Sequence, residues 1–206
     1  MKIVEKYSHL NGEEFLIVHH KSVYTQLLDV IESISAESHR TKKSKEKRKG
    51  KRMLYSPTKL NKAFYSQLST QGWESVRYSY LVTTDRDLIQ ATAFLPLDEQ
   101  RKEFAEAGIK DPIRSYKQTD FVKDKIAVEV QFGKYAFVAY DLFVKHMLFY
   151  SGRVINVGIE ILPTRKMQEE MSSGIAYFEG EVYNVMRQGR SNPPVPLLLL
   201  GVEQED

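Results

Sequence analysis

Three apolar runs in the second half of the chain constrain its fold more than any other feature. Residues 126–132, 153–162 and 197–202 are rich in β-branched and aliphatic side chains, which is typical of buried strands. Stretches with helical periodicity separate them, at 136–150 and 169–188. Strands that alternate with helices in this way form a sheet that helices cover on both faces. The sequence therefore predicts an α/β protein with a mixed central β-sheet flanked by helices.

Turn and cap signals predict the remaining elements. The first half is expected to hold strands at 2–7, 14–20 and 78–82 and helices at 23–34, 57–71, 85–93 and 96–107. The helix at 57–71 has the clearest ends, because Ser56-Pro57 is an N-terminal signal and Gly72 a stop signal. Farther on, 119–122 and 126–132 form two strands around a polar turn. Phe137, Tyr140, Val144 and Leu148 form one stripe of the helix at 136–150.

Composition limits the class of protein. With 206 residues, 42% of them apolar and 28% charged, the chain is expected to form a single globular domain spanning 1–206. The absence of cysteine excludes a disulfide scaffold, a thiolate zinc site and a cysteine nucleophile. The charged residues at 1–10 do not form a signal peptide, and the aliphatic run 197–200 is too short to cross a bilayer. We expect a cytoplasmic protein with no membrane partner.

One segment makes the chain basic. Residues 39–52 contain nine Lys and Arg residues and one acid, Glu46, for a net charge of +8, whereas the whole chain carries only +3. Such a run is either a solvated loop or an arm that contacts phosphates and releases their counterions. We expect a mobile loop at 39–52, in which Lys42 and Lys43 contact DNA.

The candidate chemistry lies on the hairpin at 119–132. Asp120 is on its first strand, and Glu129 and Gln131 share one face of the second strand, where Val130 offers a main-chain carbonyl. Two carboxylates, a carbonyl and waters make an oxygen-only site of the kind that Mg²⁺ prefers. Such an ion activates water and stabilises charge on a phosphodiester. Gln131 is no base at ordinary pH, but it can orient the attacking water.

The spacing alone is not specific, because charged residues on paired strands usually form a solvated face. Glu129 is different, since it lies in the otherwise apolar run Ile126–Phe132. An acid there is costly unless it is paired or binds a metal ion. Asp120 and Glu129 are therefore the expected metal ligands, with Val130, and Gln131 the expected third catalytic residue.

The motifs of the chain resemble those of a known enzyme group. The active-site hairpin is similar to that of the BstYI/BglII group of type II restriction endonucleases, closest to BstYI, within the PD-(D/E)XK nuclease fold. The similar segments are 7–12, 54–57, 118–124, 129–134, 139–146, 171–175, 183–185 and 187–190. They span essentially the whole chain, which makes the resemblance stronger than any single motif.

The resemblance implies both activity and target. It implies a homodimer that binds double-stranded DNA and cuts R^GATCY, leaving four-base 5′ overhangs. Asp120 and Glu129 match the acids that bind the metal ion, and Gln131 matches a glutamine where most members of the fold have lysine. The identity of the general base stays open. The expected cofactor is Mg²⁺, with Mn²⁺ able to substitute, and no organic cofactor is implied.

Other residues are candidates for contacts to DNA. The resemblance places Lys134 and Ser173, with its neighbour Ser172, at positions that read bases. A lysine can donate to guanine O6 and N7, and a serine hydroxyl tolerates either purine. On the residues alone, Lys134 is equally a surface lysine and the serines a helix cap. Arg187 and Arg190 either contact DNA or complement a helix end.

Two other functions remain possible on the sequence alone. One is a DNA-binding module that keeps the fold but does not cleave. The other is a repair nuclease that recognises the structure of DNA rather than a sequence. The retained acids Asp120 and Glu129 argue against the first.

Overall fold

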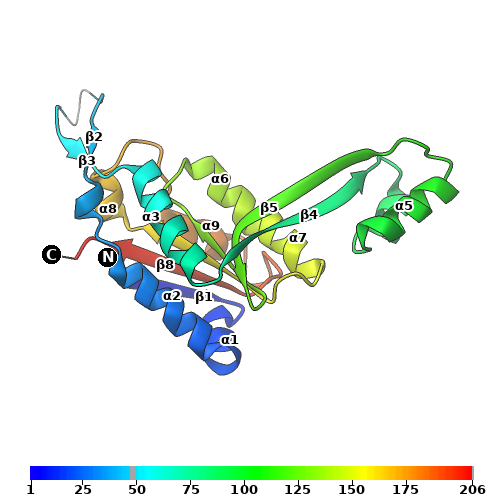
Figure 1. Cartoon of the computed structure of the whole chain (residues 1–206), viewed down its shortest axis with the longest axis horizontal. Coiled ribbons are helices and arrows are strands. Elements are labelled where there is room, and N and C mark those ends of the chain that lie inside the picture. Colours follow the sequence, from blue (N-terminus) through cyan, green and yellow to red (C-terminus); the bar gives the residue numbers. More distant parts are fainter. Residues whose placement is uncertain (47–49, 206) are drawn as a thin grey trace.

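A six-stranded mixed sheet forms the centre of the molecule (Figure 1). The computed structural model describes residues 1–46 and 50–205. The strand order is β1-β8-β7-β6-β5-β4, in which β6, β7 and β8 are parallel and all other neighbours are antiparallel. The bounds are β1 Lys2–His9, β4 Glu74–Val82, β5 Ile113–Lys123, β6 Ile126–Val130, β7 Val157–Pro163 and β8 Leu197–Glu203. The predicted mixed α/β sheet is confirmed.

Helices cover both faces of this sheet. The helices of the first half are α1 Gly12–His19, α2 Lys21–Ser33, α3 Pro57–Thr70, α4 Arg86–Thr92 and α5 Leu97–Glu106, with a short 3-10 turn η1 at Glu37–His39. The second half contains α6 Tyr135–Tyr140, the π-helix η3 Asp141–Lys145, α7 His146–Ser151, α8 Arg165–Glu169 and α9 Phe178–Arg187. None of the helices in the described part of the chain is long and apolar enough to cross a membrane.

The two faces of the sheet have separate cores. On one face, side chains of α2 and α3 such as Leu27 and Phe64 pack against Val128 and Ile159 of the central strands. On the other face, η3 and α9 pack against β8 through a second buried cluster. The alternation of side chains along a strand explains the division, since successive residues point to opposite faces. Glu129 and its neighbour across the β6–β7 ladder, Glu160, are therefore on the face covered by η3 and α7.

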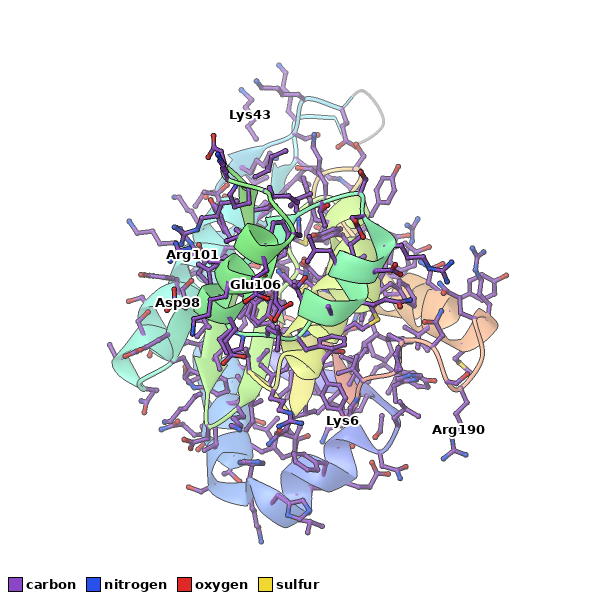
Figure 2. The ribbon with its side chains drawn as sticks, turned by 90° about the vertical axis from the view of Figure 1, so that its right-hand side faces the viewer. Lys6, Lys43, Asp98, Arg101, Glu106 and Arg190 are labelled. Atoms are coloured by element: carbon purple, nitrogen blue, oxygen red, sulfur yellow. The ribbon has the colours of Figure 1, made fainter. Side chains whose placement is uncertain are left out.

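The hairpin of β4 and β5 extends well beyond the central sheet (Figure 1). It carries α4 and α5 at its tip, where Leu81, Leu88 and Phe104 form a small apolar cluster of their own. The end of β5 that carries Asp120 is thus the base of an arm. The tip of that arm has mixed charge, with Asp98, Arg101 and Glu106 on α5 (Figure 2).

Two sequence predictions are wrong. Residues 14–20 lie mostly in helix α1 instead of a strand. The apolar run in this stretch is short, and short runs do not separate helix from strand. The start of α1 lies against β8 so closely that a Cβ at Gly12 would sit 2.3 Å from the Leu197 carbonyl oxygen. The helix predicted at 169–188 is the second error, because α8 ends at Glu169 and α9 begins only at Phe178.

The basic segment contains regular structure. Lys42 and Lys43 form strand β2, which pairs with β3 at Met53–Leu54 in a short antiparallel hairpin. Part of the mobile loop predicted at 39–52, residues 47–49, lies outside the described residues.

Candidate active site and DNA-contacting residues

The hairpin of β5 and β6 places the two predicted metal ligands opposite each other. Its loop has two residues, Asp124 and Lys125, both with positive φ (47° and 61°), as in the tight turns that match the twist of paired strands. The antiparallel register pairs Phe121 with Val128, so Asp120 and Glu129 are the next residues along the two strands. The backbone N–H of Asp120 lies 3.4 Å from Glu129 Oε1. A local turn therefore brings the two acids together.

Glu129 is buried, with only 2% of its surface exposed. Its Oε1 accepts a hydrogen bond of 2.5 Å from the Thr119 hydroxyl and lies 2.9 Å from the Lys145 ammonium. Burial raises the pKa of Glu129 to about 7, and the nearby Lys145 ammonium opposes that rise. Asp120, in contrast, is exposed. The hairpin thus presents one solvated acid and one buried acid.

Gln131 is tied to the same cluster through Asp141. Its Nε2 donates to Asp141 Oδ2 at 2.7 Å, and the other oxygen of Asp141 lies 2.7 Å from the Lys145 ammonium. Burial alone would lower the pKa of Lys145, but the carboxylates of Glu129 and Asp141 outweigh it and raise that pKa. Lys145 is therefore a fixed cation between two carboxylates.

A second buried pair lies behind this cluster. His146 Nε2 is 2.8 Å from Glu160 Oε1, and both side chains are almost completely buried. Burial lowers the pKa of His146 to about 4 and raises the pKa of Glu160 well above its ordinary value. Both shifts favour the uncharged forms of this hydrogen-bonded pair, which joins α7 to β7.

The four predicted catalytic and metal-binding residues line one cleft of about 710 Å³. Its walls come from α3, β5, β6, α6 and η3. The lining residues are Asn61, Tyr116, Lys117, Gln118, Asp120, Glu129, Val130, Gln131, Gly133, Phe137, Tyr140, Asp141 and Lys145. The cleft lies beside the base of the arm, because residues of β5 from Tyr116 to Asp120 line it.

The donor set of this cleft fits a hard divalent cation. Asp120 and Glu129 supply carboxylate oxygens, and Val130 supplies a main-chain carbonyl. Such ions take oxygen ligands and keep several waters. Within residues 1–46 and 50–205, no group of three or more His, Cys, Asp or Glu side chains is placed to hold a metal ion. The protein thus offers two acids, and water or a phosphate oxygen would complete the shell.

The two segments predicted to read bases lie side by side. Lys134 forms an isolated antiparallel bridge with Ile175, which joins the segment after β6 to the segment that contains Ser172 and Ser173. Lys134 and Ser173 are both exposed, whereas the hydroxyl oxygen of Ser172 is buried. The backbone N–H of Ser173 donates to Glu46, the acid of the basic segment, at 2.7 Å. Tertiary structure therefore joins the basic hairpin to this segment.

The other predicted DNA-contacting residues are more scattered. Arg187 is in the last turn of α9, with its guanidinium 5.7 Å from the centre of the Tyr183 ring. Arg190 lies beyond the helix, and both arginines are exposed. Lys42 and Lys43 are exposed on β2. Figure 2 shows Lys43 and Arg190 far apart, so these basic residues do not form one continuous patch.

Sequence reasoning missed the residues that surround Glu129. Asp141 and Lys145 are four residues apart and are followed at once by His146, all three buried on the helical stretch from α6 to α7. Two residues of the predicted apolar stripe, Phe137 and Val144, are 64% and 40% exposed, so this stripe is not the face that packs against the sheet. Two opposite charges at helical spacing were the available signal. Their partners on β6 and β7 are distant in sequence, so the spacing alone did not identify them.

Comparisons with known proteins agree with this geometry. The family model described as restriction endonuclease BglII/BglIII matches residues 4–202. The crystal structure of restriction endonuclease BglII complexed with a DNA 16-mer is similar, with a TM-score of 0.67 and 16% identity over 100% of this chain and 79% of that chain. The crystal structure of free BglII gives a TM-score of 0.59 and 17% identity, over 100% and 81% of the two chains. These two structural likenesses concern the fold. No curated protein matches the chain in sequence.

Proposed function

Because this chain belongs to the restriction endonuclease BglII/BglIII family and is therefore a type II site-specific deoxyribonuclease, we propose that it cuts duplex DNA with Mg²⁺ as its cofactor. Enzymes of this family work with divalent metal ions. The observation that supports Mg²⁺ is the all-oxygen donor set of Asp120, Glu129 and Val130 in one cleft. Mn²⁺ has similar ligand preferences and is expected to substitute. The closer likeness to BstYI stays a prediction.

The residues of the cleft have different roles in this proposal. Asp120 and Glu129 would hold the ion, together with the Val130 carbonyl. When bound, the ion supplies positive charge that stabilises the phosphodiester during hydrolysis. Gln131 orients the attacking water, whose oxygen bonds to phosphorus as the bond to the leaving oxygen breaks. An amide takes up no proton at ordinary pH, so this role is orientation alone.

The proposed target is a palindrome with a central GATC, cut as R^GATCY to leave four-base 5′ overhangs. The test is digestion of plasmid DNA with Mg²⁺, followed by sequencing of the fragment ends, which gives target and cut position together. Discrete fragments that begin with GATC are expected. A mobility shift without cutting, even with Mn²⁺, would indicate a DNA-binding module instead. Cutting confined to mismatched or branched duplexes would indicate a repair nuclease.

Lys134 and Ser173 are the proposed readers of the outer base pair, helped by Ser172. We predict that Lys134→Asn or Ser173→Asn changes the ratio of cleavage rates on AGATCT and GGATCC more than it lowers turnover. Each good base contact contributes about 1–3 kcal/mol of discrimination, because a wrong base leaves donors unpaired. The measurement is single-turnover cleavage of two duplexes that differ only in the outer pair.

Variants of Lys42 and Lys43 provide the matched comparison for the variants of Lys134 and Ser173. As proposed phosphate contacts, they carry no sequence information, so alanine at both positions should weaken binding to the two duplexes equally and flatten its salt dependence. Arg187, in the last turn of α9, and Arg190, just beyond that helix, are also proposed to contact DNA. If Lys134→Asn or Ser173→Asn lowered the cleavage rate of both duplexes by the same factor, Lys134 and Ser173 would not read the outer base pair.

A palindromic target favours a symmetric enzyme. We propose a homodimer in which each protomer, a single endonuclease domain of residues 1–206, reads one half-site and cuts one strand. No small organic cofactor is part of this reaction. A cytoplasmic location stays a prediction.

A further inference from the structure

Among the ion pairs found in residues 1–46 and 50–205, Lys145 is the one cation that contacts a proposed metal ligand. Its ammonium lies 2.9 Å from Glu129 Oε1 and 2.7 Å from Asp141 Oδ1. The side chains of Lys145, Glu129 and Asp141 are 10%, 3% and 11% exposed. Buried charges persist only where partners compensate them. The cluster thus holds two carboxylates and one ammonium at the floor of the cleft.

A π-helical turn presents this cluster. η3 spans Asp141–Lys145 between α6 and α7, and single π turns inside α-helices occur frequently at functional sites. The wider turn lets Asp141, Lys145 and His146 all face the sheet. His146 then bonds to Glu160 and packs so tightly on β7 that a Cβ at Gly158 would lie 2.6 Å from His146 Nδ1. The helix is fixed to the sheet one residue beyond Lys145, so the ammonium has little freedom to move.

The same cluster orients Gln131. Asp141 is a carboxylate and accepts hydrogen bonds only, so Gln131 must turn its Nε2 towards it. The amide oxygen of Gln131 is then the end that is left to accept a hydrogen bond from water. Asp141 is in turn held by Lys145, so one ammonium determines the placement of Glu129 directly and of Gln131 through Asp141.

We propose that Lys145 is a positioning residue for DNA cleavage, which holds Glu129 and, through Asp141, Gln131 in the arrangement that serves the metal ion and the water. This role rests on the proposed function. Its alternative is an ordinary core ion pair that only stabilises the fold. The two differ in a measurable way, since a purely structural residue affects cleavage only as far as it affects folding.

The test compares Lys145→Met with the double variant K145M/D141N. K145M leaves two uncompensated carboxylates, so the Tm in EDTA falls. It should also lower single-turnover cleavage about 10–100-fold, the usual effect of removing a partner of a metal ligand. Adding D141N removes one of the two charges, so the Tm recovers while cleavage stays low. Lys166→Met is the matched control, because it removes an exposed ion pair with Glu203 and should change neither quantity.

DNA binding supplies the third measurement. Mobility shifts with a GATC duplex in Ca²⁺ should give affinities within about threefold of wild type for both Lys145 variants, because phosphate and base contacts elsewhere supply the binding. If K145M cut like wild type, or if cleavage recovered together with the Tm in the double variant, the positioning role would be refuted. Failure of the wild-type protein to cut any duplex would refute the proposed function itself, and the wild-type reaction run in parallel identifies that case.

Discussion

Replacing Asp120 by alanine is expected to abolish plasmid cleavage, with a loss of about 1,000-fold or more, while the protein stays folded. Asp120 is exposed, so its carboxylate contributes little to the core. Its proposed role is to hold the metal ion, and groups that stabilise charge in the transition state account for rate factors of this size. DNA binding in Ca²⁺ should persist, because the proposed base and phosphate contacts lie on other elements.

The control for this prediction is Glu74→Ala. Glu74 is an exposed acid on the neighbouring strand β4, outside the residues that line the cleft. Its loss should leave cleavage near the wild-type rate. The measurements are single-turnover cleavage with Mg²⁺, mobility shifts with Ca²⁺ and thermal unfolding of all three proteins. Wild-type cleavage by Asp120→Ala would remove Asp120 from the active site.

Replacing Glu129 by glutamine is expected to have two opposite effects. Cleavage should be lost, because a proposed metal ligand is gone. The metal-free protein should nevertheless become more stable at pH 8, because burial raises the pKa of Glu129 to about 7 from its ordinary value of 4.5. The folded protein therefore binds this proton more tightly than the unfolded chain. Stability from this group is complete below about pH 4.5 and is lost as the pH rises through 7.

The size of this effect follows from the shift in pKa. It corresponds to a loss on the order of 3 kcal/mol between pH 4.5 and pH 8, already reduced by the help of Lys145. Thermal unfolding in EDTA should thus show Glu129→Gln above wild type by several degrees at pH 8 and close to it at pH 5. Glu106→Gln, a change of an exposed acid on α5, should track wild type at both values. Parallel Tm profiles for wild type and Glu129→Gln would contradict the raised pKa.

Divalent ions should make the wild-type protein more stable than Glu129→Gln, which reverses the order expected in EDTA at pH 8. Mg²⁺ or Ca²⁺ binds the folded wild-type site and raises its Tm by mass action, whereas Glu129→Gln should gain much less. A buried acid that lowers stability without its ligand is typical of a functional site, where stability and activity conflict. An equal gain in both proteins would show that the ion binds elsewhere.

Local features of the sequence were sufficient to identify the hairpin that carries the acids. Asp120 and Glu129 are nine residues apart, and a two-residue turn between paired strands depends on few other parts of the chain. The unusual position of Glu129 in an apolar run was visible for the same reason. The resemblance to restriction endonucleases added the residues expected to contact DNA, and the family match now supports the enzyme class.

Contacts between residues far apart in the chain could not be predicted from local sequence features. The apolar stripe predicted for the stretch from α6 to α7 includes Phe137 and Val144, which are exposed, whereas Asp141 and Lys145 of the same stretch are buried. Hydrophobic periodicity ranks apolar side chains first, so it fails where buried charges find partners on another element. The sequence also did not show that α1, which holds most of residues 14–20, begins where Gly12 lies against Leu197 of β8.

By itself, the sequence determined the α/β class, the β5–β6 hairpin and the acids that it presents, because each depends on neighbours along the chain. Only the tertiary structure decided what surrounds those acids. The ammonium of Lys145 reaches Glu129 across 16 positions of the chain, and the bridge from Lys134 to Ile175 joins two segments 41 positions apart. The first of these contacts forms because burying a charge requires a partner, and the packing of helices on the sheet decides which residue is near enough to serve.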